Sequence, residues 1–166
     1  MEVQQKCWPL LVYFSLIVAP LAKKRTAAEE ENYGQLAPGV PRPVKRRSSP
    51  ICDLSAIFET VTNNLIAVPT AWPFCHPVSP HSFPDYSNVI KNPMWYEMIR
   101  DKCRSFSYRN RNEFVADIDL VKTNCISYNG EFTMLSENVQ QLCEFVYGVL
   151  NSQAEEIANL EKEILA

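Results

Sequence analysis

The sequence predicts an all-α protein, a four-helix bundle with one long connection after the first helix. In four segments, beginning near residues 53, 95, 110 and 135, apolar residues recur at intervals of three and four, the period of an amphipathic helix. No segment shows the alternating pattern of a strand. A hydrophobic content of 46% with only 4 glycines also favours a helical globule. Four such helices are expected to bury their apolar faces against one another.

The first helix is predicted to start with Asp53 as its N-cap and to end before Pro69. Its apolar face consists of Leu54, Ile57, Phe58, Val61 and Leu65. A second, short helix is predicted from about Trp95 to Arg104, with Ile99 and Cys103 turned inward.

The third helix is predicted to begin after Asn110, because Glu113 follows three residues later in a capping-box pattern. Its apolar stripe contains Phe114, Ile118, Val121 and Cys125. A fourth helix is predicted from about Leu135 to the end of the chain. Its inward residues are Val139, Leu142, Val146, Leu150, Ile157, Leu160 and Ile164.

The connection after the first helix, residues 68–94, is rich in proline and yet carries many large apolar side chains. These are Trp72, Phe74, Val78, Phe83, Tyr86, Val89 and Ile90. Loops of this length are uncommon in compact domains and are usually functional or disordered. Burying an aromatic ring is worth a few kcal/mol. We therefore expect these side chains to be packed and the loop to have a defined shape.

Two segments precede the bundle. Within residues 1–25, whose role the sequence leaves uncertain, an apolar run from Cys7 to Ala22 is shorter than the ~20 residues that span a bilayer, although it has the length of a signal-peptide core. A secreted or membrane-targeted protein is thus one alternative. Residues 26–50 form a basic, proline-rich linker that we expect to be disordered. Its cluster Lys45-Arg46-Arg47 is either solvated charge or a nuclear-targeting signal.

The net charge limits the class of partner, and the cysteine pattern indicates the redox compartment. Residues 51–166 carry eight Lys/Arg and fifteen Asp/Glu, a net charge of 8 − 15 = −7, which disfavours direct binding to nucleic acid and suits a basic partner. The 6 cysteines form no C-x-x-C pair, so we expect free thiols in a reducing compartment. Cys75-His76 lacks further ligands at metal-site spacing. We predict no metal, no cofactor and, without a catalytic constellation, no enzymatic activity.

Four motifs carry a resemblance to a known family. They are Trp72-Pro73-Phe74, Pro84-Asp85-Tyr86, Asn92-Pro93-Met94 and Tyr128-Asn129, in this order. Over roughly residues 53–162 the chain resembles a bromodomain. The resemblance implies a left-handed four-helix bundle, with residues 51–166 as the domain, in which the long first loop and the end of the third helix form an acetyl-lysine pocket.

The resemblance also implies roles for single residues. Asn129 is similar to the family's anchoring asparagine, whose amide holds the acetyl carbonyl; taken alone, Asn129-Gly130 also fits a simple turn. Tyr86 is similar to the tyrosine that reaches the same carbonyl through water. The other positions implied are Phe74 against the acetyl methyl, Trp72 and Pro73 as an outer shelf, Val78 and Phe83 on the loop wall, Cys125 and Tyr128 on the helix wall, and Leu135 as gatekeeper.

Two positions depart from the family pattern. Trp95-Tyr96 stands where Asp-Leu is usual, which removes a helix cap that typically contributes about 1 kcal/mol, so that the second helix either starts differently or is capped by Asn92. Ser87 stands where a second tyrosine is common. Both changes bear on how rigid the loop is.

These observations predict a non-enzymatic nuclear reader of acetylated lysine on histone tails, associated with transcription-initiation or chromatin complexes. An alternative is a helical scaffold with an idle pocket, because residues 154–164 have a near-heptad apolar spacing that suits pairing with another helix. The third reading is a secreted helical protein led by the apolar segment at the N-terminus.

Overall fold

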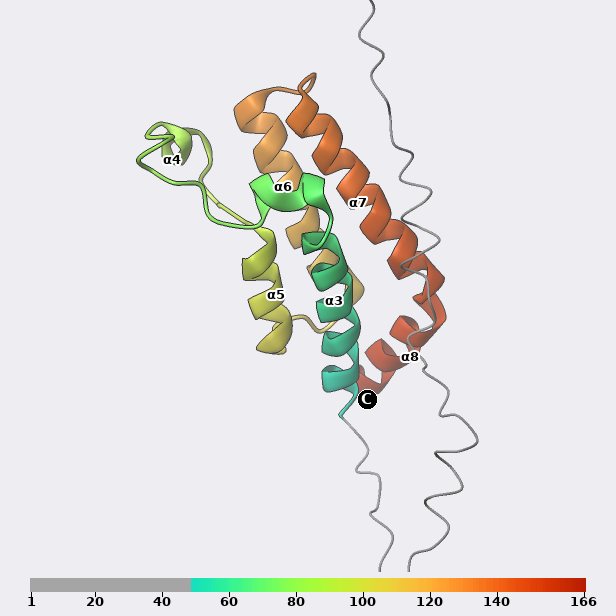
Figure 1. Cartoon of the computed structure of the whole chain (residues 1–166). Helices are drawn as coiled ribbons and strands as arrows, with labels where there is room; N and C mark the ends of the chain where they lie inside the picture. Colours follow the sequence, from blue (N-terminus) through green and yellow to red (C-terminus); the bar gives the residue numbers. More distant parts are fainter. Residues whose placement is uncertain (1–48) are drawn as a thin grey trace, which may run out of the picture. The chain divides into compact units, whose positions relative to one another are not determined.

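The computed structural model describes residues 49–166, and every regular element in this range is helical (Figure 1). The elements are α3 (Pro50–Ile66), the 3-10 helix η1 (Pro69–Phe74), α4 (Tyr86–Val89), α5 (Tyr96–Arg104), α6 (Arg111–Asn129), α7 (Met134–Ser152) and α8 (Ala154–Leu165). The predictions for residues 1–25, and for the linker up to residue 48, lie outside the described residues.

Helices α3, α5, α6 and α7 form the predicted bundle. Helix α3 packs against α5 and α7, and α6 packs against α5 and α7 (Figure 1). One continuous core runs between them, and the apolar stripes expected from the sequence supply it. Fully buried members include Leu54, Phe58, Leu65, Ile99, Phe114, Ile118, Val139, Val146 and Leu150. The fold class predicted from the sequence is confirmed.

Helix α3 begins four residues earlier than predicted, with Ser49 at the N-cap position, so the assignment of Asp53 as N-cap is wrong. The chain is extended at Ser49 and becomes helical at Pro50. Proline suits the first helical position because its fixed φ matches the helix and its missing N–H has no partner there. The Ser49 carbonyl accepts hydrogen bonds from the N–H groups of Cys52, at 2.8 Å, and Asp53, at 3.1 Å. Asp53 lies in the first turn, where a carboxylate favours the helix dipole.

Helices α5 and α6 follow the prediction closely. Trp95 is extended and takes the N-cap position of α5 without a side-chain hydrogen bond, so the usual cap is absent and Asn92 does not replace it. At the start of α6, the Asn110 side chain accepts a hydrogen bond from the Glu113 N–H at 2.9 Å. The Glu113 carboxylate accepts in return from the Arg109 N–H at 2.8 Å, one residue before the expected partner.

The predicted fourth helix is wrong in its length, because the chain breaks at Gln153 into α7 and α8. A straight helix over both segments would be about 48 Å long, whereas α3 with its 17 residues spans about 26 Å. The far half would extend beyond the bundle. The break turns α8 back onto α3, where Ile157 is buried and Leu160 and Ile164 pack against the core (Figure 1).

The long loop is shaped but only partly buried. It contains two short helices that the sequence pattern did not predict, η1 and α4. Phe74 and Ile90 are buried, but Trp72 is 74% exposed and Phe83 and Val89 are each 49% exposed. The expectation that all of the loop's apolar side chains would be packed is therefore wrong for these three. Of these three, Phe83 lines the cavity described below, and Trp72 and Val89 do not.

The cysteines at 52, 75, 103, 125 and 143 are free thiols, and all but Cys52 are buried. Burial of this kind is typical of cysteine acting as a small core residue. Cys7 lies outside the described residues. Within residues 49–166, no helix has the length and apolar character required to cross a membrane.

Candidate functional site

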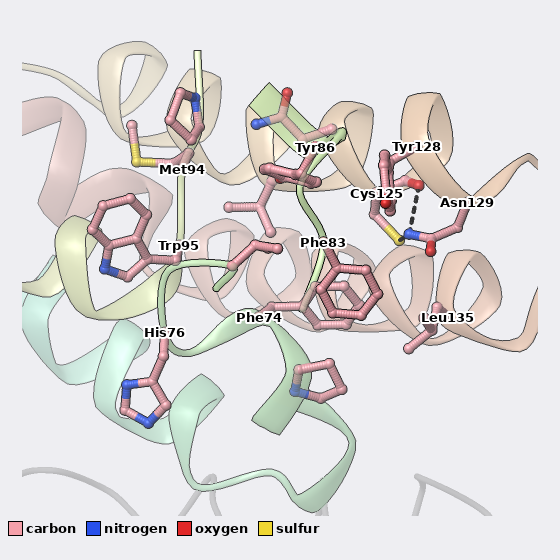
Figure 2. A pocket seen from close by; sticks show the side chains of 15 residues that line it. Phe74, His76, Phe83, Tyr86, Met94, Trp95, Cys125, Tyr128, Asn129 and Leu135 are labelled. Atoms are coloured by element: carbon pink, nitrogen blue, oxygen red, sulfur yellow. Dashed lines mark hydrogen bonds between the residues drawn. The ribbon is translucent and has the colours of Figure 1, made fainter. Parts of the chain in front are cut away.

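A cavity of about 160 Å³ opens between the long loop and the ends of α6 and α7 (Figure 2). A water needs about 10–15 Å³ measured in this way, so the cavity is much larger than the space that one water needs. Its lining consists of Pro73, Phe74, His76, Val78, Phe83, Tyr86, Pro93, Met94, Trp95, Val121, Asn124, Cys125, Tyr128, Asn129 and Leu135. Nine of the ten site residues predicted from the sequence are among them, and Trp72 lies outside.

Sequence reasoning missed six of the lining residues. Pro93 and Met94 belong to a motif that carried the resemblance, and Trp95 follows it directly, so the sequence held a signal for all three. Val121 was assigned to the core stripe alone. His76 had been considered only as a metal ligand. Asn124 lies among the inward residues of α6, where an amide side chain is an anomaly that predicts a buried polar contact.

Asn129 is the last residue of α6, and its side chain lies at one end of the cavity (Figure 2). The helix ends there because Gly130 takes a φ of 90°, which favours glycine. The Asn129 amide nitrogen donates to the Cys125 carbonyl at 3.0 Å, which fixes the side chain on the last turn of the helix. An amide nitrogen carries two N–H groups. The same nitrogen also lies 3.6 Å from the Cys125 Sγ, which is a weak acceptor that a stronger one on a ligand can replace.

The turn between α6 and α7 holds Leu135 near Asn129. Ser136 donates from its hydroxyl to the Gly130 carbonyl at 2.6 Å. Thr133 caps α7 by accepting from the Ser136 N–H at 3.2 Å, and its hydroxyl contacts the Ser136 hydroxyl at 2.9 Å. These hydrogen bonds fix the backbone of the turn, and with it the positions of Asn129 and Leu135.

Two side-chain hydrogen bonds join the loop to α6. The Tyr128 hydroxyl donates to the Asp85 carboxylate at 2.8 Å, and the Asn124 amide donates to the Asn92 carbonyl at 2.8 Å. The bond to Asp85 raises the pKa of the Tyr128 hydroxyl, because ionisation would remove the donated proton. Both hydrogen bonds are made by residues that line the cavity, and together they set the distance between the loop and α6.

The cavity walls are aromatic on the loop side. Tyr86 follows Asp85, and its ring packs edge-on against Tyr128 with centroids 5.0 Å apart. Phe83 makes a similar contact with Tyr128 at 6.2 Å, and Phe74 meets the buried ring of Tyr96 at 6.1 Å. Burial raises the pKa of the Tyr86 hydroxyl. Tyr86 therefore presents a neutral O–H to the cavity at ordinary pH.

At the far end of the cavity from Asn129 lie Met94, Trp95 and His76 (Figure 2). The His76 Nδ1 pairs with a Glu97 carboxylate oxygen at 2.8 Å, and the other oxygen of Glu97 accepts from Arg100 at 3.2 Å. The imidazole is thus anchored by α5. Trp95 supplies an indole where the usual capping aspartate is absent.

None of the 15 residues lining the cavity is an aspartate, glutamate, lysine or arginine. Burial also raises the pKa of the Cys125 thiol, which keeps that wall uncharged. The cavity therefore suits an uncharged guest with an apolar body and at least one hydrogen-bond acceptor. Among the described residues, no three His, Cys, Asp or Glu side chains cluster in a way that would hold a metal ion.

The family model described as Bromodomain matches residues 58–141, half of the chain. The chain belongs to the bromodomain family. The match begins in α3 and ends in α7, so it includes the long loop and the cavity of this bromodomain.

Relatives of known identity agree. Transcription initiation factor TFIID subunit 1 from Drosophila melanogaster is 35% identical over 111 residues, which cover 67% of this chain and 5% of that protein. Bromodomain adjacent to zinc finger domain protein 1A from Mus musculus is 39% identical over 93 residues, covering 54% of this chain and 6% of that protein. The bromodomain chain therefore spans only a small part of these relatives.

The solved structure of the bromodomain from human BAZ1A superposes with a TM-score of 0.56 and 30% identity, covering 60% of this chain and 92% of that one. The left-handed four-helix bundle follows from this likeness. Within the family, Ala67-Val68-Pro69 and the segment Leu160–Ile164 resemble the second bromodomain of the largest TATA-box-binding-protein-associated factor. The similarity to TFIID subunit 1 agrees with that resemblance.

Proposed function

We propose that residues 51–166 form a non-enzymatic reader of acetylated lysine, with histone tails as the ligand. The observation that carries the proposal is an uncharged cavity with the Asn129 amide at one end. Acetylation turns the lysine ammonium into a neutral amide with a carbonyl acceptor and a methyl group. The cavity offers a matching group for each part of that amide.

In this proposal one N–H of the Asn129 amide donates to the acetyl carbonyl in place of its weak contact with the Cys125 Sγ, and Tyr86 reaches the same oxygen through a water. The methyl group packs beside Phe74, which is buried apart from its face on the cavity. Val78, Phe83, Cys125, Tyr128 and Leu135 surround the four-carbon stem, with Pro73 and Trp72 at the outer edge. An unmodified lysine would bury its ammonium without a carboxylate in the lining, at a cost of several kcal/mol.

The relatives support the setting. They include a transcription initiation factor and, in Yarrowia lipolytica, histone acetyltransferase GCN5, which is 36% identical over 91 residues. We accordingly place this domain in the nucleus, in transcription-initiation or chromatin complexes. Its charge of −7 over residues 51–166 suits a lysine-rich tail and not the phosphates of nucleic acid.

The test is a calorimetric titration with two copies of one histone-tail peptide, acetylated and unmodified. We expect measurable binding of the acetylated copy only, with an affinity near −6 kcal/mol, or tens of micromolar, because one anchored side chain buries little area. Equal binding of both copies would overturn the proposal. Binding of neither, across a set of acetylated tails, would do the same.

The scaffold alternative depended on residues 154–164 pairing with a foreign helix. In the structure, Ile157 is buried and Leu160 and Ile164 pack on the protein's own core. Leu165 is the large apolar side chain of α8 that stays exposed. The apolar face that would have paired is therefore already occupied.

A further inference from the structure

Exposed apolar side chains gather at one end of the described bundle. Seven large apolar residues of the described chain are exposed. Five of them lie in the long loop and at the junction of α6 and α7, the two segments that border the cavity: Trp72, Phe83, Val89, Phe132 and Met134. The other two, Phe106 and Leu165, lie at the opposite end, where α5 and α8 finish (Figure 1). Single exposed apolar residues are common, but a concentration beside a cavity marks an interaction surface.

Phe132 and Met134 are the most informative members. Phe132 is 93% exposed in the short turn between α6 and α7, and Met134, the first residue of α7, is 70% exposed. In sequence they lie between Asn129 and Leu135, which both line the cavity. The hydrogen bonds from Ser136 and Thr133 hold this turn closed. The two side chains are therefore presented from a fixed backbone at the cavity mouth.

We propose that Phe132 and Met134 form a docking surface for a large apolar side chain of the bound peptide, one to three residues from the acetylated lysine. This inference rests on the proposed function. An extended peptide advances about 3.3 Å per residue, so the neighbours of a lysine held at Asn129 must lie over the mouth. At this edge of the mouth the peptide meets an aromatic ring and a thioether. Burying an apolar side chain there removes apolar surface from water on both partners.

The chemistry of the turn favours a peptide with an apolar neighbour over one with a purely polar or acidic flank. Glu131 is the one charged side chain in residues 130–134, so the turn offers no cation to an acidic flank. Methionine adapts its shape to different apolar partners. A peptide also explains why the surface adjoins the cavity, because the same ligand occupies both. A second copy of the chain would cover the mouth and compete with that ligand.

The test compares acetylated peptides in pairs. The two peptides of a pair differ at one position, two residues before or two residues after the acetyl-lysine, where one carries leucine and the other serine. Each is titrated against the parent chain, the variant Phe132→Ser/Met134→Ser and the control Leu165→Ser. The control removes a side chain of similar exposure at the distant end of the bundle. We expect the parent and the control to prefer a leucine peptide by about tenfold, the effect of burying part of one large side chain. The double variant should bind both peptides equally.

The outcomes separate this inference from the proposed function. Acetyl-dependent binding without a leucine preference, or a preference that survives the double substitution, overturns the docking surface and leaves the reader intact. Loss of acetyl dependence in every peptide overturns both. Concentration-dependent dimerisation of the parent that the double variant abolishes would assign the surface to a second copy and overturn the peptide. Both serines replace exposed side chains, so an unchanged Tm is expected and confirms that the fold is retained.

Discussion

The hydroxyl of Tyr128 donates a 2.8 Å hydrogen bond to Asp85, and this contact fixes the long loop to the end of α6. Tyr86 follows Asp85 in the chain and packs its ring against Tyr128. One hydrogen bond therefore positions a cavity residue on the loop relative to Asn129, the neighbour of Tyr128 on the helix. The geometry of the cavity depends on an interaction between residues 43 apart in sequence.

Replacing Tyr128 with phenylalanine tests this tie. Tyr128→Phe keeps the ring contacts with Tyr86 and Phe83 but removes the donor to Asp85. We expect severalfold weaker binding of an acetylated peptide, measured by calorimetry, because a looser loop must be ordered on binding. Asp85→Asn is the matched control, since its amide oxygen still accepts the hydrogen bond. Unchanged affinity in Tyr128→Phe would show that the ring packing alone sets the loop.

Two asparagines of α6 provide a second comparison. Asn129→Ala should reduce binding of an acetylated peptide about tenfold or more, through loss of ~1 to 3 kcal/mol, with little change in Tm because the side chain is exposed. Asn124→Ala should lower the Tm as well, since it removes a buried amide that donates to the Asn92 carbonyl at 2.8 Å and ties the loop to α6. An Asn129→Ala protein that unfolds, or that binds like the parent, would make Asn129 structural.

Phe106 is the residue with the least favourable backbone. Its φ of 56° is the sole positive value among the described residues other than glycine, and a bulky side chain there costs roughly 1–2 kcal/mol. Phe106→Asn should therefore raise the free energy of unfolding by about 1 kcal/mol in a urea titration. Ser105→Asn is the control, because Ser105 has a φ of −88° and gains nothing. A lower stability for Phe106→Asn would mean that the ring contributes more packing than its exposure indicates.

Buried thiols predict alkaline instability. Burial raises the pKa of Cys103 and Cys143 from 9.0 to about 12. The unfolded chain releases these protons near 9, whereas the folded chain holds them until about 12. Their contribution to stability is thus fully present below the ordinary thiol pKa and is lost as pH rises through that interval. We expect the urea midpoint to fall steadily over this range in the presence of a reducing agent. A flat midpoint would place the two thiols in contact with solvent.

Sequence reasoning reached the bundle because periodic apolar residues such as Phe58, Phe114 and Val146 report burial locally. It also brought nine cavity residues together through motifs quoted from the loop and from α6. The error in the last helix has a cause outside the local sequence: the pattern around Gln153 stays helical, and the break there depends on the length of the partner helix α3. Likewise, no local signal distinguishes a buried Phe74 from an exposed Trp72, since the side of the loop that packs on the bundle is set by the whole fold.

The return of α8 onto α3 has a consequence for longer proteins that contain such a domain. The last helix of the domain packs on its first, and the C-terminus lies beside the start of α3 (Figure 1). A polypeptide that enters at Pro50 and leaves after Leu165 therefore re-emerges close to where it came in. The chain matches 5% of one such relative, which is many times longer. Inserted into a chain of that size, the domain adds little to the distance between the segments before and after it, because its two ends lie close together.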